Sequence, residues 1–180
     1  MKLNSRRLLT SLLILISTIS HAQKASLFVI NEESFEIPGN WKFIGHIEES
    51  GQFHLTNKKE KLNLMISVRK SEYFEFYQEN LSEKELLDKF YKWEYDYWSS
   101  PNARKTEVSE TKRNEEKNYI IWKINIKNMP ENDNNDKISY LLYTVKNNKL
   151  ISLNLSNNRG RKNQLTEIES IEHLEKIHLK

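Results

Sequence analysis

Apolar and polar residues alternate along most of the chain after its first 33 residues, which is the pattern of β-strands with one buried face. Phe35 and Ile37, for example, alternate with polar neighbours. The segments with this pattern are 34–37, 52–55, 62–69, 105–112, 119–127, 138–146 and 150–156. Short polar turns separate neighbouring segments, and Asn147-Asn148 tolerates the positive φ angles of a tight hairpin. We therefore expect a mainly antiparallel sheet of about six or seven strands.

A complete helix start signal interrupts these strands. Ser82 can cap a first turn, and Glu85 can reach back to it as the partner in a capping box. One face of the following helix is apolar and is expected to be core: Leu86, Phe90, Trp93 and Tyr97. The helix should end near Trp98, because the residue before Pro101 avoids the helical conformation.

A second helix is predicted to begin near Asn163. Thr166 and Glu169 offer another capping box. Its apolar face consists of Leu165, Ile168, Ile171 and Leu174. The tail beyond fits either the end of this helix or a last short strand. Two helices that each bury one face on an antiparallel sheet define an α+β sandwich.

The residues after the first alternating segment predict where the strand ends and where a tryptophan lies. Pro38 cannot donate to a strand ladder and Gly39 permits a tight turn, so the strand must stop there. Trp41 follows at once. We expect its ring at the end of the sheet, in the gap between sheet and helix.

Residues 1–22 have the three parts of a secretory signal peptide. Basic residues open the segment, an apolar run of about a dozen residues starts at Leu8, and small residues stand before the expected cleavage between Ala22 and Gln23. The run is shorter than the ~20 residues of a membrane span, and no later segment comes closer. Arg6-Arg7 leaves twin-arginine export open beside the general secretory route. We expect a product in the periplasm or outside the cell.

Removal of this segment changes the charge of the protein. The chain has 28 Lys+Arg against 25 Asp+Glu, and Lys2, Arg6 and Arg7 leave with the signal, which contains no acid. The mature chain therefore balances, and it lacks the net basic field that nucleic-acid binders usually carry. Residues 23–180 are a normal size for a single domain. The chain has no cysteine, so we expect neither disulfides nor a lipid anchor.

The element order and one short motif resemble a known fold. The motif is F-x-I-P-x-x-W, formed by Phe35, Ile37, Pro38 and Trp41. Together with Leu165–Ile171 near the end, it resembles the PsbP-like fold. That fold is shared by the extrinsic PsbP subunit of photosystem II, the Mog-type Ran-binding import factor and many small exported bacterial proteins of unknown function. The resemblance implies an α/β/α sandwich that acts by binding rather than catalysis, and it assigns no partner-contacting residue here.

The histidines do not form a metal-binding motif. His46 and His54 fall on different predicted strands. His173 and His178 are five apart, which on a helix places them about 140° from each other. Without cysteine or an H-x-x-x-H spacing, we expect neither a metal nor another cofactor.

Two polar loops leave alternatives open. Residues 131–136 read E-N-D-N-N-D, like a fragment of a calcium loop, but they lack the turn glycine and the bidentate glutamate. They fit a solvated acidic loop or a weak calcium site. Arg159-Gly160-Arg161-Lys162 precedes a helix start, where anions are attracted. It fits an ordinary basic turn or a contact with phosphate head groups or lipopolysaccharide.

Aromatic residues gather in 73–77 and 90–98. A second helix stripe, formed by Leu87, Tyr91, Glu94 and Trp98, widens the apolar arc beyond the need of one sheet face. Rings at such rims often serve interfaces. The candidate binding residues are Tyr73, Phe76, Tyr77, Tyr91 and Trp98. Simple packing is the alternative for this set.

No catalytic signature is present, whether a G-x-S-x-G elbow, a phosphate loop or a catalytic cysteine. We therefore expect an exported non-enzymatic binding or assembly-accessory protein of the cell envelope, whose aromatic rim meets another protein. One alternative is a carrier that holds a small apolar ligand between helix and sheet. Another is a cryptic hydrolase, which would need a histidine beside an acid and a nucleophile in a cleft.

Overall fold

The computed structural model describes residues 24–100, 106–127, 138–157 and 165–179. Its strands are β1 (Ala25–Ile30), β2 (Glu33–Pro38), β3 (Lys42–Ile47), β4 (Gln52–Asn57), β5 (Leu62–Lys70), β6 (Thr106–Asn114), β7 (Tyr119–Ile126), β8 (Ile138–Lys146), β9 (Lys149–Asn157) and β10 (His178–Leu179). Its helices are α2 (Glu83–Ser99), α3 (Glu167–Glu175) and the short 3-10 turns η1 (Glu48–Ser50) and η2 (Ser71–Tyr73). The predictions for residues 1–22, 131–136 and 159–162 lie outside the described ranges.

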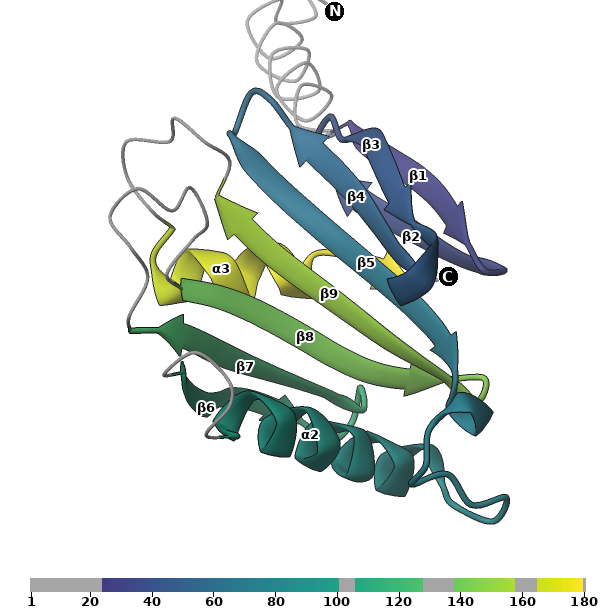
Figure 1. Cartoon of the computed structure of the whole chain (residues 1–180). Coiled ribbons are helices and arrows are strands. Elements are labelled where there is room, and N and C mark those ends of the chain that lie inside the picture. The colour runs from purple at the N-terminus through teal and green to yellow at the C-terminus, as the bar shows by residue number, and fades with distance from the viewer. Residues whose placement is uncertain (1–23, 101–105, 128–137, 158–164, 180) are drawn as a thin grey trace, which may run out of the picture.

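Seven strands form one antiparallel sheet in the order β3-β4-β5-β9-β8-β7-β6 (Figure 1). The predicted hairpins are present: β4 pairs with β5, β6 with β7, and β8 with β9. Asn147 and Asn148 connect the last pair with φ angles of 51° and 57°, as the asparagine pair predicts. The expected α+β class is confirmed. Strand β3 was not assigned from the sequence, because its side chains are largely exposed and show no alternation.

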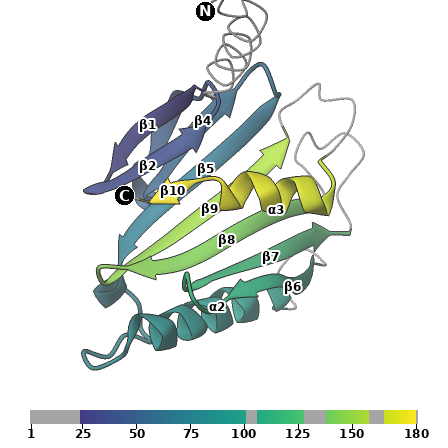
Figure 2. The ribbon, with the colours of Figure 1, turned by 180° about the vertical axis from the view of Figure 1, so that it is seen from behind.

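A second, smaller sheet has the order β1-β2-β10 and lies, together with α3, on the face of the large sheet that is turned toward the viewer in Figure 2. The central strand β2 carries the alternation read from the sequence, with Phe35 and Ile37 buried. Strand β1 precedes the first segment predicted, so that five strands come before the long helix. The ambiguous tail proves to be a strand, because β10 pairs with β2.

Trp41 is buried at the strand end, as the turn at Pro38-Gly39 predicts, with 6% of its surface exposed. Its indole Nε1 donates to the carbonyl oxygen of Pro38 at 2.9 Å, and its backbone amide donates to Ser26 Oγ at 2.9 Å. Gly39 adopts a φ of 102°, which few residues other than glycine accept. The indole belongs to the core on the α3 side of the large sheet.

Helix α2 begins as the capping box predicts. Ser82 Oγ accepts from the amide of Glu85 at 3.3 Å, and Glu85 Oε2 accepts from the amide of Ser82 at 2.8 Å. Leu86 and Phe90 are buried as expected, but Tyr97 is 63% exposed, so its assignment to the core was wrong. In the last turns of α2, the second stripe packs against the sheet and the first stripe does not. Trp98 belongs to this second stripe.

The large sheet buries side chains on both faces in its middle strands. Ile120 and Trp122 of β7 face the α2 core, whereas Ile121 faces the core under α3 and the small sheet. The expectation of one buried face per strand is therefore wrong for β7 and β8. A nearly continuous apolar run, as in β7, is the pattern of a strand covered on both sides.

Candidate ligand cavity and docking surfaces

The aromatic residues proposed from the sequence as a binding surface divide into packed and exposed groups. Tyr73 in η2 is 72% exposed. Phe76 is half-buried, with its ring centroid 5.2 Å from that of Phe74 and 6.3 Å from that of Trp93. Phe76 is therefore part of a ring cluster at the start of α2 as much as a surface residue.

The other three candidates also pack against the α2 core. The ring of Tyr91 makes an edge contact with Trp122, with centroids 5.8 Å apart. Trp98 Nε1 donates to Glu94 Oε2 at 3.1 Å. Tyr77 Oη accepts from Asn148 Nδ2 at 3.4 Å. Four of the five proposed side chains are thus half-buried and held by neighbours, and Tyr73 is the one that is mostly exposed.

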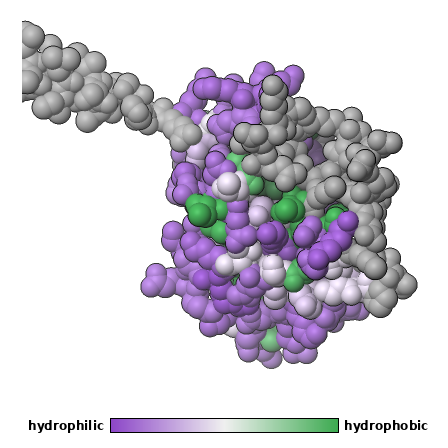
Figure 3. All heavy atoms as spheres, turned by 90° about the vertical axis from the view of Figure 1, so that its left-hand side faces the viewer, coloured by the Kyte–Doolittle hydropathy of each residue, from purple (hydrophilic) through white to green (hydrophobic). Residues whose placement is uncertain are grey.

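A different apolar surface lies on the edge strands of the two sheets. Its members, each between 43% and 68% exposed, are Leu27, Val29, Phe43, Ile44 and Ile47. They belong to β1 and β3, which are end strands of their sheets and lie at the same side of the molecule (Figure 1). We call this set the edge surface. By contrast, the side shown in Figure 3 is mainly hydrophilic over the described residues, with apolar atoms in small groups.

A buried carboxylate ties α2 to the sheet. Glu94 lies 3.7 Å from the Arg69 guanidinium of β5, measured from Oε1 to Nη2. Burial raises the pKa of Glu94, and Arg69 partly offsets this effect. Burial, together with Glu94, also raises the pKa of Tyr143 well above its usual value. Arg69 further lies over the ring of Phe74, 4.7 Å from its centroid. This group anchors the second half of the helix.

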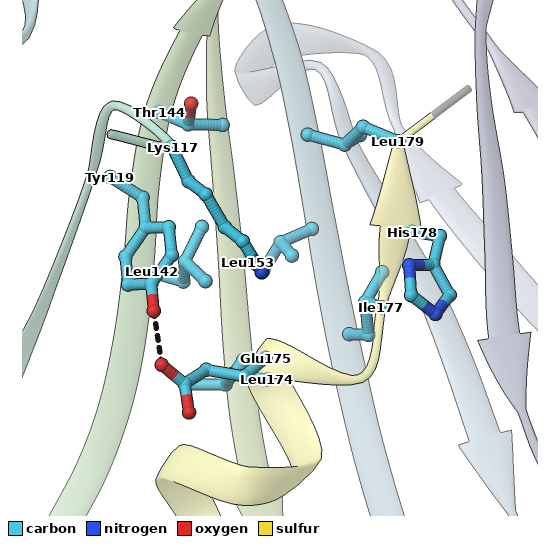
Figure 4. Close-up of a pocket in the computed structure, with 10 residues that line it drawn as sticks. All are labelled: Lys117, Tyr119, Leu142, Thr144, Leu153, Leu174, Glu175, Ile177, His178 and Leu179. Carbon is cyan, nitrogen blue, oxygen red and sulfur yellow. Dashed lines mark hydrogen bonds between the residues drawn. The ribbon is translucent and has the colours of Figure 1, made fainter. Parts of the chain in front are cut away.

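A cavity of about 270 Å³ opens between α3, β10 and the large sheet (Figure 4). Its lining residues are Lys117, Tyr119, Leu142, Thr144, Leu153, Leu174, Glu175, Ile177, His178 and Leu179. The apolar members Leu142, Leu153 and Leu174 are fully buried and form its floor. Figure 4 shows Ile177 and Leu179 on one side of the β10 segment and His178 on the other.

One wall of this cavity is polar. Tyr119 Oη donates to Glu175 Oε1, and Lys112 Nζ lies 2.5 Å from the same oxygen. Burial acts to raise the pKa of Glu175, but the bonds from Lys112 and Tyr119 outweigh it and lower that pKa below its ordinary value. Burial and the bond to Glu175 raise the pKa of Tyr119. Glu175 is therefore a carboxylate with its charge already compensated.

A second hollow, of about 630 Å³, lies near η1 and η2 and includes Tyr73 in its lining. The charged groups around Lys149 in this hollow neutralise one another. Lys149 Nζ lies 3.0 Å from Glu32 Oε2 and 3.1 Å from Glu33 Oε1. Glu33 is almost fully buried and also faces Lys146 at 3.7 Å. We interpret this cluster as the anchor of the β1–β2 turn on the β8–β9 turn.

The histidines are distributed as the sequence spacing indicates. His46 stacks on Phe53 with centroids 4.2 Å apart, and His54 lies on the neighbouring strand β4. His178 reaches the cavity of Figure 4, whereas His173 belongs to α3. Within the described ranges, no three His, Cys, Asp or Glu side chains are grouped so that they could hold a metal ion. No helix of the described residues is long and apolar enough to cross a membrane.

The architecture now defines the class: two sheets and two helices arranged as an α+β sandwich with the PsbP-like fold. One solved structure with this fold is the solution structure of cyanobacterial PsbP (CyanoP) from Synechocystis sp. PCC 6803, which is similar to this chain with a TM-score of 0.52 and 13% sequence identity. The alignment covers 89% of this chain and 95% of that one. Likeness at this identity shows the fold alone. No family model matches the sequence, and neither does any curated protein.

The resemblance read from the motif at residues 35–41 is thus confirmed for the fold. The residues of the cavity were not found from the sequence. Leu174 was assigned only to a helix face, and the tail after it was left ambiguous. The edge surface was also missed, because neither β1 nor β3 was predicted as a strand.

Proposed function

We propose that this protein is an exported, non-enzymatic binding or assembly-accessory protein of the cell envelope. The observation that supports this most is the edge surface, with Phe43 55% and Val29 68% exposed. Exposed apolar side chains that gather on one side of a protein often mark a site where a partner binds. Among the five aromatic residues proposed from the sequence, Tyr73 alone offers comparable exposure, so it is a secondary contact.

The partner that fits this surface is a protein that contributes an extended apolar segment. Strand β3 is an end strand, paired on one side with β4, so one row of its backbone groups is open to another strand. Proteins usually protect such edges with charges or proline, but β3 reads K-F-I-G-H-I, with a charge only at Lys42. An added strand would pair with this edge, and its side chains would cover Phe43 and Ile47.

The sequence supports the remaining parts of the proposal. Residues 1–22 have the composition of a signal peptide, which accounts for export. The absence of a catalytic signature supports a role in binding. The compensated charges around Lys149 and Glu175 support a structural role for the charge clusters in the two hollows.

A site-specific experiment can test the docking surface. A photo-crosslinking residue at Phe43 in the full chain, expressed in its own cells, should give a discrete adduct with one protein. The same residue at Lys92, on the exposed side of α2, is the matched control and should give none. In the purified complex, the β3 amides should exchange more slowly with deuterium. The double variant Ile44→Lys with Ile47→Lys, which keeps the crosslinking residue at position 43, should lose the adduct.

The alternatives give different results in that experiment. An adduct of twice the mass of this chain would show that a second copy occupies the edge. Loss of the complex in Tyr91→Ala with Trp98→Ala, and retention in the β3 double variant, would instead support the aromatic rim. Equal adducts from positions 43 and 92, or unchanged amide exchange in β3, would contradict docking at this edge.

A second function has support from a separate observation. The cavity of Figure 4 lies between helix and sheet, where the sequence alternative placed a small apolar ligand, and its floor consists of buried leucines. Its volume of about 270 Å³ is close to the lower limit of roughly 300 Å³ for ligand pockets. Native mass spectrometry of the protein isolated from its own cells should show a bound small molecule. Protein without any adduct, and without displacement of a fluorescent lipid probe, would contradict the carrier role.

A further inference from the structure

We infer that the cavity beneath α3 and β10 binds a small amphipathic anion, namely a carboxylate with a medium-length alkyl chain. Its chain would lie on the leucine floor, and its carboxylate would meet the ammonium group of Lys117. This inference rests on the carrier function proposed above and names its ligand class. It does not depend on docking at the edge surface, which lies on other strands.

The floor of the cavity is suited to an alkyl chain. Leu142 of β8, Leu153 of β9 and Leu174 of α3 are each at most 5% exposed and present only hydrocarbon. Ile177 and Leu179 add half-buried aliphatic side chains from the β10 segment. Five aliphatic residues from four segments thus surround one volume, and an alkyl chain that enters it would leave water.

The polar wall selects the head group. The Glu175 carboxylate already accepts from Tyr119 and faces Lys112. The Thr144 hydroxyl donates to the carbonyl oxygen of Asn118 at 2.7 Å. Lys117 lines the cavity as an exposed ammonium; no ion pair among the described residues includes it, although its charge helps to lower the pKa of Glu175. Lys112 and Lys117 thus face a single carboxylate, Glu175, and this wall carries one positive charge in excess, which favours an anion over a neutral or cationic head.

The size of the cavity limits the chain. A volume of about 270 Å³ holds roughly nine water molecules at liquid density, since each occupies about 30 Å³. A ligand of octanoate size fits this space, whereas a membrane lipid with two long chains does not. Each methylene that enters the cavity should strengthen binding about fourfold, until the floor is filled.

Calorimetry with defined probes tests the assignment on the full-length protein. Octanoate should bind with one molecule per chain and about fifteenfold more tightly than hexanoate, which is two methylenes shorter. Lys117→Gln should weaken the binding of octanoate about tenfold or more and leave the affinity for octanol unchanged. Only the carboxylate of octanoate interacts with the positive charge of Lys117. Lys92→Gln, an exposed lysine on α2, is the matched control and should change neither affinity.

A second variant and a measurement on the wild type locate the site. Ile177→Trp fills the cavity and should abolish binding of octanoate and octanol, whereas Lys176→Trp, its exposed neighbour, should not. If Ile177→Trp does not fold, methyl NMR of the wild type serves as the test instead. Addition of octanoate should then shift the methyl signals of Leu142 and Leu153. Unchanged leucine signals in the presence of saturating octanoate would overturn the site.

One result would contradict the proposed ligand class, and a different result would contradict the carrier function. Equal loss of octanoate and octanol in Lys117→Gln would contradict the anionic head and leave an apolar carrier in place. Failure of both probes to bind, together with an empty native mass spectrum, would contradict the carrier function as well. Neither result affects the crosslinking test of β3.

Discussion

The two helices cover opposite faces of one seven-stranded sheet, and the cores beneath them differ in composition. Under α2 the core is rich in rings: Phe90 stacks on Tyr143 at 4.6 Å, and Trp122 meets Tyr143 edge-on at 5.1 Å between centroids. Under α3 the core is mainly aliphatic and includes Leu153 and Leu174. The ring-rich side is closed by a 17-residue helix, and the aliphatic side by a nine-residue helix together with the three-stranded sheet.

This difference sets a closely packed face of the sheet apart from a face that contains a cavity. Large rings in edge and stacked contacts fill the space under α2, and they contribute much of the apolar burial. The shorter α3 leaves a cavity where the chain passes to β10. The carboxylates of Glu94 and Glu175 also differ between the two faces of the sheet. Burial raises the pKa of Glu94 on the α2 side, whereas hydrogen bonds lower that of Glu175 beside the cavity.

The largest effect should come from the ring-rich core. Trp122→Ala should reduce the free energy of unfolding by about 3–5 kcal/mol, because it removes a fully buried indole from between two other rings. Urea unfolding followed by circular dichroism measures this. Ile168→Ala, at an exposed position of α3, is the control and should change stability by less than about 0.5 kcal/mol. A loss at Trp122 no larger than that of the control would contradict the importance of the ring core.

The next effect is a pH dependence of opposite sign on the two faces. The pKa of Glu94 is raised in the folded state above its ordinary 4.5, so stability should fall as pH rises from 4.5 through the raised pKa. The pKa of Glu175 is lowered, so its contribution is present above 4.5 and is lost as pH falls through the lowered pKa. One proton gives at most about 1.4 kcal/mol per pH unit.

Two isosteric variants measure these slopes in urea unfolding between pH 3 and pH 7. Glu94→Gln should remove the decline above pH 4.5, so wild type loses stability relative to this variant as pH rises. Glu175→Gln should remove the decline below pH 4.5. Curves of both variants parallel to that of the wild type would show that neither carboxylate is coupled to folding.

The helix caps should have smaller and equal effects. Thr166 Oγ1 accepts from the amide of Glu169 at 3.3 Å, in the same geometry that Ser82 provides for Glu85. Ser82→Ala and Thr166→Ala should each cost about 1 kcal/mol in the free energy of unfolding. If cavity formation depends on α3, octanoate should bind more weakly to Thr166→Ala but not to Ser82→Ala. Equal affinities in the two variants would show that the cavity tolerates fraying of α3.

The smallest effect on stability is expected at the edge surface. Phe43→Lys should change the free energy of unfolding by less than about 0.5 kcal/mol, because the side chain is already more than half exposed. The same substitution should abolish the crosslink from a photo-crosslinking residue placed at Ile47 instead of Phe43. A large loss of stability would mean that Phe43 is structural, and its exposure would then not indicate a partner.

Local signals in the sequence were enough for much of the fold. The alternation around Phe35, the Ser82 capping box and the asparagine pair at 147–148 each act over a few residues, so they can be read without tertiary context. The motif at Pro38 and Trp41 was also sufficient to suggest the PsbP-like fold.

The remaining features depend on partners far away in the chain. Whether Ile121 is core is decided by the small sheet and α3, and whether Tyr97 is buried is decided by how far the sheet extends beneath α2. The cavity combines Lys117 with residues from five other elements, so no local pattern reveals it. Strand β3 lacked alternation because its side chains have no cover on either face.

The short strand β10 has a consequence for how the molecule is assembled during synthesis. It pairs with β2, which pairs on its other side with β1, so that one layer joins residues from nearly opposite ends of the described chain. A nascent chain cannot complete this layer until residue 179 has emerged, and pairings between such distant residues form slowly. The cavity that β10 helps to enclose therefore forms last, and a ligand could bind in it only after the fold is complete.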